Sequence, residues 1–275
     1  MALITYNPTT SSRRHLVLTN KSKLWRGKPM KNLAKGLSSS GGRNNKGRIT
    51  VVGRSRGAKK KYRLLDFKRK KTLEATVIRI EYDPNRSAHI ALIKFSDGQY
   101  SYITALEKMC IGDRIVSSTS QDIAIGNCMD VISIPVGTLI NSLELKPGKG
   151  AQIARSAGAF AKIVSKDSSN VSIQLSSGEV RVVLGTCKAT IGVVSNADNK
   201  NIKLAKAGRK RWMGYRPKVR GVAKNPVDHP HGGGEGRTSG GRHPVNANGK
   251  PTKGFRTRNN KRTDKYILKS RHKNK

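Results

Sequence analysis

Acidic residues are scarce in this chain: its 275 residues include 16 Asp and Glu against 56 Lys and Arg, a formal net charge of +40. Aromatic residues make up 5% and hydrophobic residues 35%, below the roughly 45–50% apolar share of an ordinary globular domain. One well-filled core therefore cannot include the whole length. Self-repulsion at this charge destabilises a compact chain unless a polyanion neutralises it. This excludes a conventional neutral enzyme and favours nucleic acid as the partner, with an anionic membrane surface as the lesser candidate.

Cysteines, long apolar runs and export signals are also few or missing. Cys110, Cys128 and Cys187 are widely spaced and odd in number, which indicates neither a disulfide framework nor a metal-ligand pair. No apolar run approaches the roughly 20 residues of a membrane span, and the first residues lack the apolar core of a signal peptide. We expect a soluble, intracellular protein. Ser and Arg at positions 11–14 partly fit a mitochondrial presequence, so an organellar location stays open.

Nearly all of the excess charge lies in two flanking segments. Residues 1–72 hold 21 basic and 1 acidic residue, residues 73–202 hold 13 and 12, and residues 203–275 hold 22 and 3. The three segments thus carry +20, +1 and +19. Stretches of the flanks such as 38–48 and 221–261 have no apolar face, so they cannot offset their ordering entropy alone. The sequence predicts a near-neutral folded middle between two basic extensions that order against a partner.

Strand signals are concentrated in the middle segment. Runs rich in β-branched residues, bounded by turn residues such as Asp97-Gly98, predict strands at Leu73–Tyr82, Ala88–Phe95, Gln99–Thr104, Asp130–Ile134, Val171–Leu175, Glu179–Leu184 and Cys187–Val194. Short strands without a sustained helical period favour small barrels or a sandwich. We prefer two small barrels that join near residue 125 over one larger sandwich. A short basic helix within 202–212 is a further candidate, which Gly208 weakens.

The charge pattern and the strand signals together predict four regions. Residues 1–72 are a basic N-terminal extension leading into the first barrel, and residues 73–125 are that barrel. Residues 126–202 are the second barrel, and residues 203–275 are a basic C-terminal extension with a loop rich in His and Gly.

A basic run, Arg54–Arg63, closed by Lys68–Lys71, is the first candidate site. Arg offers phosphate a planar fork, Lys offers a point charge, and Gly57 lets backbone amides approach a phosphate oxygen. The alternative is a solvated charged face, but such faces usually mix signs. A single acidic residue in the first 72 therefore favours nucleic-acid contact.

The loop His229–Arg237 (HPHGGGEGR), with Asp228 before it, is the second candidate site. A metal site is disfavoured because Pro230 separates the two histidines, and no cysteine lies nearby. General-base chemistry at His229 would need a packed pocket, which this segment cannot supply. The glycines allow the backbone to lie against a sugar-phosphate surface while the imidazoles stack on bases or donate to phosphates. We favour contact with irregular RNA over chemistry.

Other motifs exclude functions or assign side chains. Gly36–Gly41 resembles the start of a phosphate-binding P-loop, but Gly42-Arg43 follows where Lys-Ser/Thr is required. A GxSxG nucleophile elbow is absent. Aromatic residues among basic ones are candidates for stacking on bases: Trp25, Trp212 and Tyr215. Tyrosines within predicted strands are assigned to packing: Tyr82, Tyr100 and Tyr102.

Specific motifs extend along nearly the whole chain. The most specific is Asn225–Arg237 (NPVDHPHGGGEGR), preceded by Arg216–Val222 (RPKVRGV). Further motif segments lie at 40–45, 47–50, 66–69, 81–87, 134–137, 147–150, 154–158, 177–181 and 249–254. In this order, the segments resemble the universal L-two family of large-subunit ribosomal proteins.

The resemblance implies a fold and a function. The fold is mainly β: an OB-like barrel followed by an SH3-like barrel, with long, basic, irregular N- and C-terminal extensions that thread into large-subunit rRNA. The implied protein is a non-enzymatic constituent of the large subunit that binds rRNA early in assembly and supports subunit association and tRNA binding. The implied partners are rRNA, other ribosomal proteins, the small subunit and nearby tRNA, with no membrane. No cofactor is implied, although structural Mg²⁺ bridging to rRNA stays open. The location is a ribosome in the bacterial cytoplasm or, alternatively, in a mitochondrion or plastid.

Candidate site residues follow from the charge pattern and the resemblance. Expected rRNA-binding residues are Arg43, Arg48, Arg54, Arg56, Lys59, Lys60, Lys61, Arg63, Lys68, Arg69, Arg86, Lys149, Arg155, Arg209, Arg211, Trp212, Arg216 and Arg220. Residues that the resemblance places near the peptidyl transferase centre are His229, His231, Gly232, Gly233, Gly234, Glu235 and Arg237. No residue is expected to be catalytic, with His229 the weak candidate, and none to bind a metal.

Three segments depart from the family pattern. Arg54–Ala58 (RSRGA) stands where the family usually has Arg-Gly-Gly-Gly-His, the turn between Lys71 and Glu74 is short, and Val245–Asn248 replaces a segment that more often holds Pro-Trp. We expect local RNA contacts to differ there. Charge alone also fits a generic binder of single strands or chromatin, which stays open as an alternative.

Overall fold

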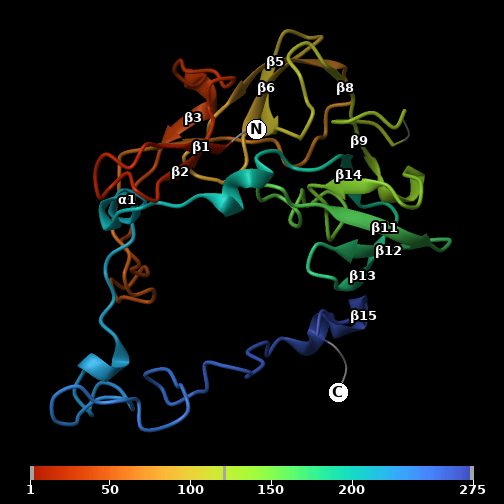
Figure 1. Ribbon diagram of the computed structural model, residues 1–275. Coiled ribbons are helices and arrows are strands. Elements are labelled where there is room, and N and C mark those ends of the chain that lie inside the picture. The colour runs from red at the N-terminus through yellow and green to blue at the C-terminus, as the bar shows by residue number, and fades with distance from the viewer. Residues whose placement is uncertain (1–2, 120–121, 273–275) are drawn as a thin grey trace. The chain divides into compact units, whose positions relative to one another are not determined.

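The computed structural model describes residues 3–119 and 122–272 (Figure 1). Positions 1–2, 120–121 and 273–275, which fall within the predicted extensions and first barrel, lie outside the described residues. The described residues form two compact units. The barrel unit draws on Met1–Leu37, Lys59–Ala207 and Asp264–Lys275, and the basic unit on Ser38–Ala58 and Gly208–Thr263.

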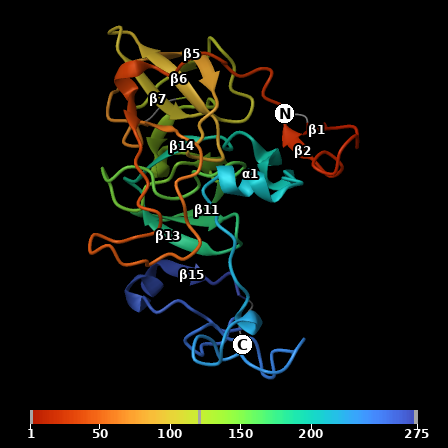
Figure 2. The ribbon, with the colours of Figure 1, turned by 90° about the vertical axis from the view of Figure 1, so that its left-hand side faces the viewer.

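The first barrel of the barrel unit is a curled sheet of four strands in the order β7-β6-β5-β8. Figure 2 labels three of these strands, β5, β6 and β7. These are β5 (Ala75–Glu81), β6 (Ile90–Phe95), β7 (Tyr100–Thr104) and β8 (Arg114–Ile115). The turn between β6 and β7 closes where Gly98 N–H donates to Phe95 O at 2.9 Å, with Gly98 at φ +80°. A register shift between Val77 and Arg79 adds twist to β5. The strands predicted at Leu73–Tyr82, Ala88–Phe95 and Gln99–Thr104 are confirmed, and they pair in order as antiparallel neighbours.

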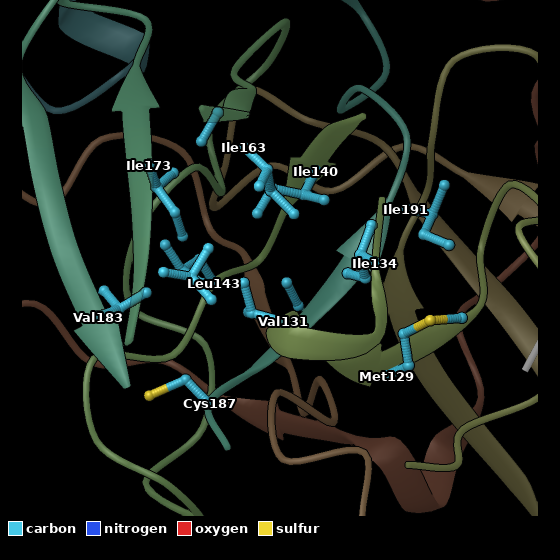
Figure 3. Packing of buried hydrophobic residues seen from close by; sticks show 13 residues of the cluster. Met129, Val131, Ile134, Ile140, Leu143, Ile163, Ile173, Val183, Cys187 and Ile191 are labelled. Atoms are coloured by element: carbon cyan, nitrogen blue, oxygen red, sulfur yellow. The ribbon is translucent and has the colours of Figure 1, made fainter. Parts of the chain in front are cut away.

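The second sheet has seven strands in the order β15-β13-β12-β11-β10-β14-β9. They are β9 (Cys128–Asp130), β10 (Leu139–Asn141), β11 (Ala161–Lys166), β12 (Asn170–Leu175), β13 (Val180–Leu184), β14 (Lys188–Ile191) and β15 (Ile267–Lys269). All neighbouring strands run antiparallel. Ile140, Leu143, Ile163 and Ile173 point into a shared core (Figure 3). Along β11, buried Ala161 and Ile163 alternate with exposed Lys162 and Val164, so burial follows the period of two that a strand imposes.

Two predicted elements are wrong in part. Asp130–Ile134 is not one strand: β9 ends at Asp130, and the 3-10 helix η2 (Val131–Ser133) follows. Ile134 N–H closes this turn on Val131 O at 3.3 Å, directly before Pro135. The basic helix is shorter than predicted, since α1 spans Ala207–Trp212 and Ala205 lies before it at φ +59°.

The sequence-based reading of the tyrosines and cysteines is partly confirmed. Tyr102 is fully buried, whereas Tyr82 and Tyr100 are 43% and 38% exposed and do not fill a core. Cys128 and Cys187 are buried free thiols, and Cys110 is exposed. Strand alternation predicted which residues lie in strands but not which edge positions stay open to solvent.

Short elements also form within the flanking segments and at the end of the middle segment. In the barrel unit, β1 (Leu3–Thr5) pairs with β2 (Val17–Thr19), and β3 (Ala34–Gly36) pairs with β4 (Lys61–Arg63). Single 3-10 turns occur at η1 (Lys31–Leu33), η3 (Ala197–Asn201), η4 (Gly221–Ala223) and η5 (Lys261–Tyr266). The last strand, β15, pairs with β13, so the end of the C-terminal extension completes the second sheet.

Candidate nucleic-acid interface

Two guanidinium groups converge on one aromatic ring in the barrel unit. The Cζ of Arg155 lies 4.7 Å from the ring centroid of Phe67, and the Cζ of Arg86 lies 5.7 Å from it. Arg86 follows β5 of the first barrel, whereas Arg155 lies between β10 and β11 of the second. Stacking on the ring fixes the plane of each guanidinium and leaves its N–H edges free to donate.

One buried carboxylate orients the first of these arginines. Asp83 is fully buried and accepts from Arg86 Nε at 2.8 Å. The Asn85 backbone N–H donates to the same carboxylate at 2.8 Å, and Arg63 Nη1 lies 3.9 Å from it. Arg155 Nη1 instead donates to Ala151 O at 3.1 Å. Two guanidinium groups, of Arg86 and Arg63, therefore share one carboxylate, and Arg155 adds a third positive charge without a carboxylate partner in the described ion pairs. This excess of positive charge suits an anionic ligand.

A buried carboxylate also holds the loop that carries Lys149. Glu144 is 1% exposed, and its Oε1 accepts from Gly150 N–H at 2.7 Å. Its Oε2 accepts from Gly148 N–H at 3.2 Å and Lys188 N–H at 3.1 Å. The glycines are required here, because Gly150 lies at φ +92° and a Cβ would meet Phe67 O at 3.2 Å. The exposed Lys149 is thereby fixed between two anchored glycines.

The loop also connects to the segment that carries Phe67. Ala151 N–H donates to Phe67 O at 2.8 Å. This bond joins the loop of the second barrel to the residue on which Arg86 and Arg155 stack. Lys149, Arg86 and Arg155, all three among the expected rRNA-binding residues, therefore belong to one neighbourhood joined by hydrogen bonds and by stacking on Phe67.

Arg69 differs from the other predicted RNA-binding residues because it is buried. It is 8% exposed, and its Nε donates to Ser117 Oγ at 2.9 Å while Nη2 donates to Gly126 O at 3.2 Å. Burial lowers the pKa of its guanidinium. The nearby Cys128 and Asp66 side chains act in the other direction and partly raise that pKa. Its donors are directed to protein acceptors, so Arg69 connects the first barrel to the start of the second.

The basic unit is built where the two extensions pair with each other. Ser55 N–H donates to Gly214 O at 2.9 Å, Ala58 N–H to Trp212 O at 2.8 Å, and Arg216 N–H to Gly53 O at 3.0 Å. The Arg54 Cζ lies 4.4 Å from the ring centroid of Tyr215. Sequence reasoning missed this pairing, since the partners are about 160 residues apart and neither has a strand pattern.

A glycine explains the altered segment Arg54–Ala58. Gly57 lies at φ +67°, and a Cβ there would meet Trp212 O at 2.6 Å and Gly214 N at 2.7 Å. A Cβ on Gly214, at φ +91°, would likewise lie 2.9 Å from Ser55 O. The close approach of the two segments therefore depends on Gly57 and Gly214, and the departure at the positions next to Gly57 leaves the pairing intact. The basic unit holds 20 of the 56 basic residues and 2 of the 16 acidic ones. With so few carboxylates, the basic unit cannot neutralise its own positive charge by ion pairing.

The predicted RNA-binding residues divide by exposure. The exposed residues are Arg43, Arg48, Arg54, Arg56, Lys59, Lys61, Lys68, Lys149, Arg155, Arg211, Trp212, Arg216 and Arg220. Half-buried are Lys60, Arg63, Arg86 and Arg209. Most of the set is thus available to an external ligand.

The loop His229–Arg237 is ordered by its own imidazoles. The rings of His229 and His231 stack with centroids 5.2 Å apart. His231 N–H donates to His229 Nδ1 at 3.0 Å, and Val245 N–H donates to His231 Nε2 at 3.0 Å. Since His231 Nε2 accepts, its Nδ1 donates to Gly240 O at 2.7 Å. The altered segment at Val245 therefore takes part in holding this loop.

The remaining residues of this loop have distinct placements. A Cβ on Gly232 would meet Lys224 O and Asn225 O at 2.5 Å, and Gly233 and Gly234 both lie at φ +90°. Glu235 and Arg237 are exposed. The glycines are thus required by close approach and by left-handed backbone, as the sequence suggested.

His229 is not built as a buried base. Slight burial lowers its pKa, with the charges of His231 and Lys224 acting in the same direction. Its Nδ1 is occupied as an acceptor, which leaves Nε2 for any other proton. Across residues 3–119 and 122–272, no group of three or more His, Cys, Asp and Glu is arranged to hold a metal ion.

Comparison with known proteins decides the family. A model described as "Ribosomal Proteins L2, RNA binding N-terminal domain" matches residues 30–117, and one described as "Ribosomal Proteins L2, C-terminal domain" matches residues 124–249. The chain belongs to the Ribosomal Proteins L2 family. It is therefore a structural constituent of the large ribosomal subunit that binds rRNA, and not an enzyme.

Relatives in the L2 family extend along the full chain. The "Large ribosomal subunit protein uL2" of Rickettsia prowazekii is 61% identical over 272 residues, which is 98% of this chain and 100% of that protein. The protein of the same name from Sphingopyxis alaskensis is 58% identical over 273 residues, 99% of this chain and 98% of its own. Both come from bacteria, so this L2 chain is of the bacterial type, whose large subunit works in the bacterial cytoplasm.

The L2 assignment fits the fold. The N-terminal model includes the four-stranded sheet, which corresponds to the OB-like barrel, and the C-terminal model includes six strands of the second sheet, which corresponds to the SH3-like barrel. In the described parts of the chain, no helix is long and apolar enough to cross a membrane. Sequence reasoning found the arginines but missed the carboxylates Asp83 and Glu144. Asp83 lies inside the matched segment 81–87, whereas Glu144 lies outside every matched segment and gave no signal.

Proposed function

We propose that this L2 chain grips large-subunit rRNA at two places, the arginine pair on Phe67 and the basic unit. The observation that carries the proposal is the convergence of Arg86 and Arg155, from different barrels, on one ring beside the anchored Lys149 loop. Guanidinium groups held in plane bind phosphate oxygens in pairs. One rRNA segment bound there would contact both barrels and hold them together during assembly.

The basic unit is the second proposed rRNA-binding site. Its charge is high because RNA phosphates, rather than carboxylates, neutralise it on binding. Residues Arg43, Arg48, Arg54, Arg56 and Arg216 are exposed and stand in this unit without a comparable number of acidic residues. Mg²⁺ that bridges phosphates near this unit belongs to the same proposal.

Finer roles come from the family resemblance. The loop His229–Arg237 would lie near the peptidyl transferase centre, where its glycines allow close approach to RNA. The chain would support association with the small subunit and tRNA binding. Peptide-bond formation would belong to the RNA, since the imidazoles of His229 and His231 are engaged with each other and with the loop backbone.

Competition tests the proposal against a generic single-strand or chromatin binder. Full-length protein bound to a transcript of the rRNA segment that it protects is challenged with random-sequence DNA of equal length at about 0.15 M salt. Specific contacts typically add roughly 10³-fold or more over non-specific binding, so we expect DNA to compete at least about a thousandfold less well than unlabelled transcript. Equal competition would favour the generic binder.

A further inference from the structure

Trp25 is half exposed although its backbone is tied to β5. The residue is 49% exposed, and its N–H donates to Ile80 O at 2.8 Å. It also forms a parallel bridge with Glu81. Hydrogen bonding to β5 therefore fixes the Trp25 backbone, while part of its indole stays exposed to solvent. Trp25 lies outside the ranges 30–117 and 124–249 that the family models match.

A buried acid-base chain holds a guanidinium on the indole. The Arg79 Cζ lies 4.7 Å from the ring centroid of Trp25, and Arg79 Nε donates to Glu81 Oε1 at 2.7 Å. Glu81 is 3% exposed, and Tyr102 OH donates to it at 2.9 Å. Turning Arg79 away would leave a buried carboxylate without its cation, which is strongly unfavourable. Arg79 thus positions the indole.

Gly27 limits the indole from a second direction. A Cβ at Gly27 would lie 2.6 to 2.8 Å from three indole atoms of Trp25. The ring consequently lies directly against this glycine's backbone. With Arg79 and Gly27 both in contact, the orientation of the ring is set before any ligand arrives, which reduces the entropy cost of binding.

The surroundings of Trp25 carry one sign of charge. Residues 20–30 contain Lys21, Lys23, Arg26 and Lys28 and no acidic residue, and all four basic residues are exposed. Lys21 Nζ lies 3.5 Å from the ring centroid of Tyr82, a second half-exposed aromatic at the end of β5. Exposed aromatics among cations are the combination that binds unpaired nucleotides, since bases stack on the rings and phosphates meet the cations.

We propose that the exposed part of the Trp25 indole is a stacking platform for one unpaired base of large-subunit rRNA, with the neighbouring phosphates bound by Lys23 and Arg26. The proposal rests on the proposed function, that the chain binds rRNA. The alternative occupant, an apolar protein surface, is disfavoured because four exposed cations lie within four residues of Trp25 in the chain and residues 20–30 contain no acidic residue.

Substitution at Trp25 separates stacking from charge. In the full chain, Trp25→Leu is expected to lower affinity for a transcript of the protected rRNA segment about 5- to 100-fold, because stacking on one base contributes roughly 1–3 kcal/mol. The slope of log affinity against log salt should not change, since no charge is removed. Trp25→Phe should restore most of the loss. Lys23→Gln and Arg26→Gln should each make the slope shallower by about 0.7 to 0.9.

A matched control and a direct readout complete the test. Tyr100→Leu removes an aromatic of similar exposure from β7 and should leave affinity within about twofold. A transcript carrying 5-iodouridine at unpaired positions should cross-link under ultraviolet light to the tryptic peptide that contains Trp25. Unchanged affinity of Trp25→Leu without a cross-link, while wild-type binding keeps its steep salt dependence, would overturn the platform alone. Wild-type protein that lacks salt-dependent rRNA binding would instead contradict the proposed function.

Discussion

Removing the charge of residues 38–58 should weaken rRNA binding more than any other change of equal charge. We expect a variant with its five basic residues replaced by Gln to show a slope of log affinity against log salt that is shallower by about 3.5 to 4.5, since each phosphate contact contributes about 0.7 to 0.9. The residues changed are Arg43, Lys46, Arg48, Arg54 and Arg56. At about 0.1 M salt the same contacts correspond to a loss of about 10³- to 10⁴-fold in affinity.

The control removes the same charge from the near-neutral middle of the chain. Five exposed residues there are replaced by Gln: Lys94, Lys108, Arg114, Lys162 and Lys200. We expect the control to shift the slope by less than about one, since these residues belong to barrel surfaces on which both signs of charge occur. The slopes of log affinity against log salt are measured by filter binding over a salt series. Equal slopes for the two variants would mean that the position of the removed charges does not affect rRNA binding. The basic unit would then have no special role.

Loss of the Glu144 carboxylate should produce the second large effect. Glu144→Ala removes the acceptor of three backbone N–H groups, from Gly148, Gly150 and Lys188. Each buried donor left without a partner costs about 1–3 kcal/mol, and the two on the loop regain water as it opens. We therefore expect the free energy of unfolding to fall by about 3 kcal/mol in urea titrations of the full chain.

The same change should release Lys149 and weaken rRNA binding. Glu144→Gln keeps one acceptor oxygen and should fall between the wild type and the alanine variant. Glu107→Ala, at an exposed carboxylate, should alter stability by no more than about 0.5 kcal/mol. A Glu144→Ala protein as stable as the Glu107→Ala protein would show that the carboxylate does not hold this loop.

The sequence predicted the barrels better than their edges. Alternation of apolar residues and the Asp97-Gly98 turn identified β5, β6 and β7 because a pleated strand imposes a period of two. β11 was missed because Val164, an apolar residue at an exposed position, breaks the alternation that Ala161, Lys162 and Ile163 begin. β15 was missed because three residues within a basic tail carry almost no pattern. Pairing with β13, distant in the chain, makes β15 a strand. The four region bounds drawn from composition stay predictions.

The sequence predicted that the candidate interface binds RNA, but not which distant segments pair to form it. Runs of Arg and Lys with few acidic residues indicated RNA, because phosphate neutralises charge that the chain itself cannot. The pairing of residues 53–58 with 212–216 was not predictable, since it depends on the close approach that Gly57 permits. Arg69 carries the same charge as its neighbours, and only the structure shows that its guanidinium faces protein acceptors.

The central claim is that contacts with RNA phosphates neutralise the positive charge that the protein's own carboxylates leave unpaired. The most direct test is the affinity of the full chain for its rRNA segment, measured across a salt series. Six to ten phosphate contacts predict a loss of about 10³- to 10⁵-fold between 50 and 200 mM salt. We expect the wild-type protein to fall within or beyond that range. A loss of less than about tenfold would contradict the account, because a net charge of +40 would then contribute little to binding RNA.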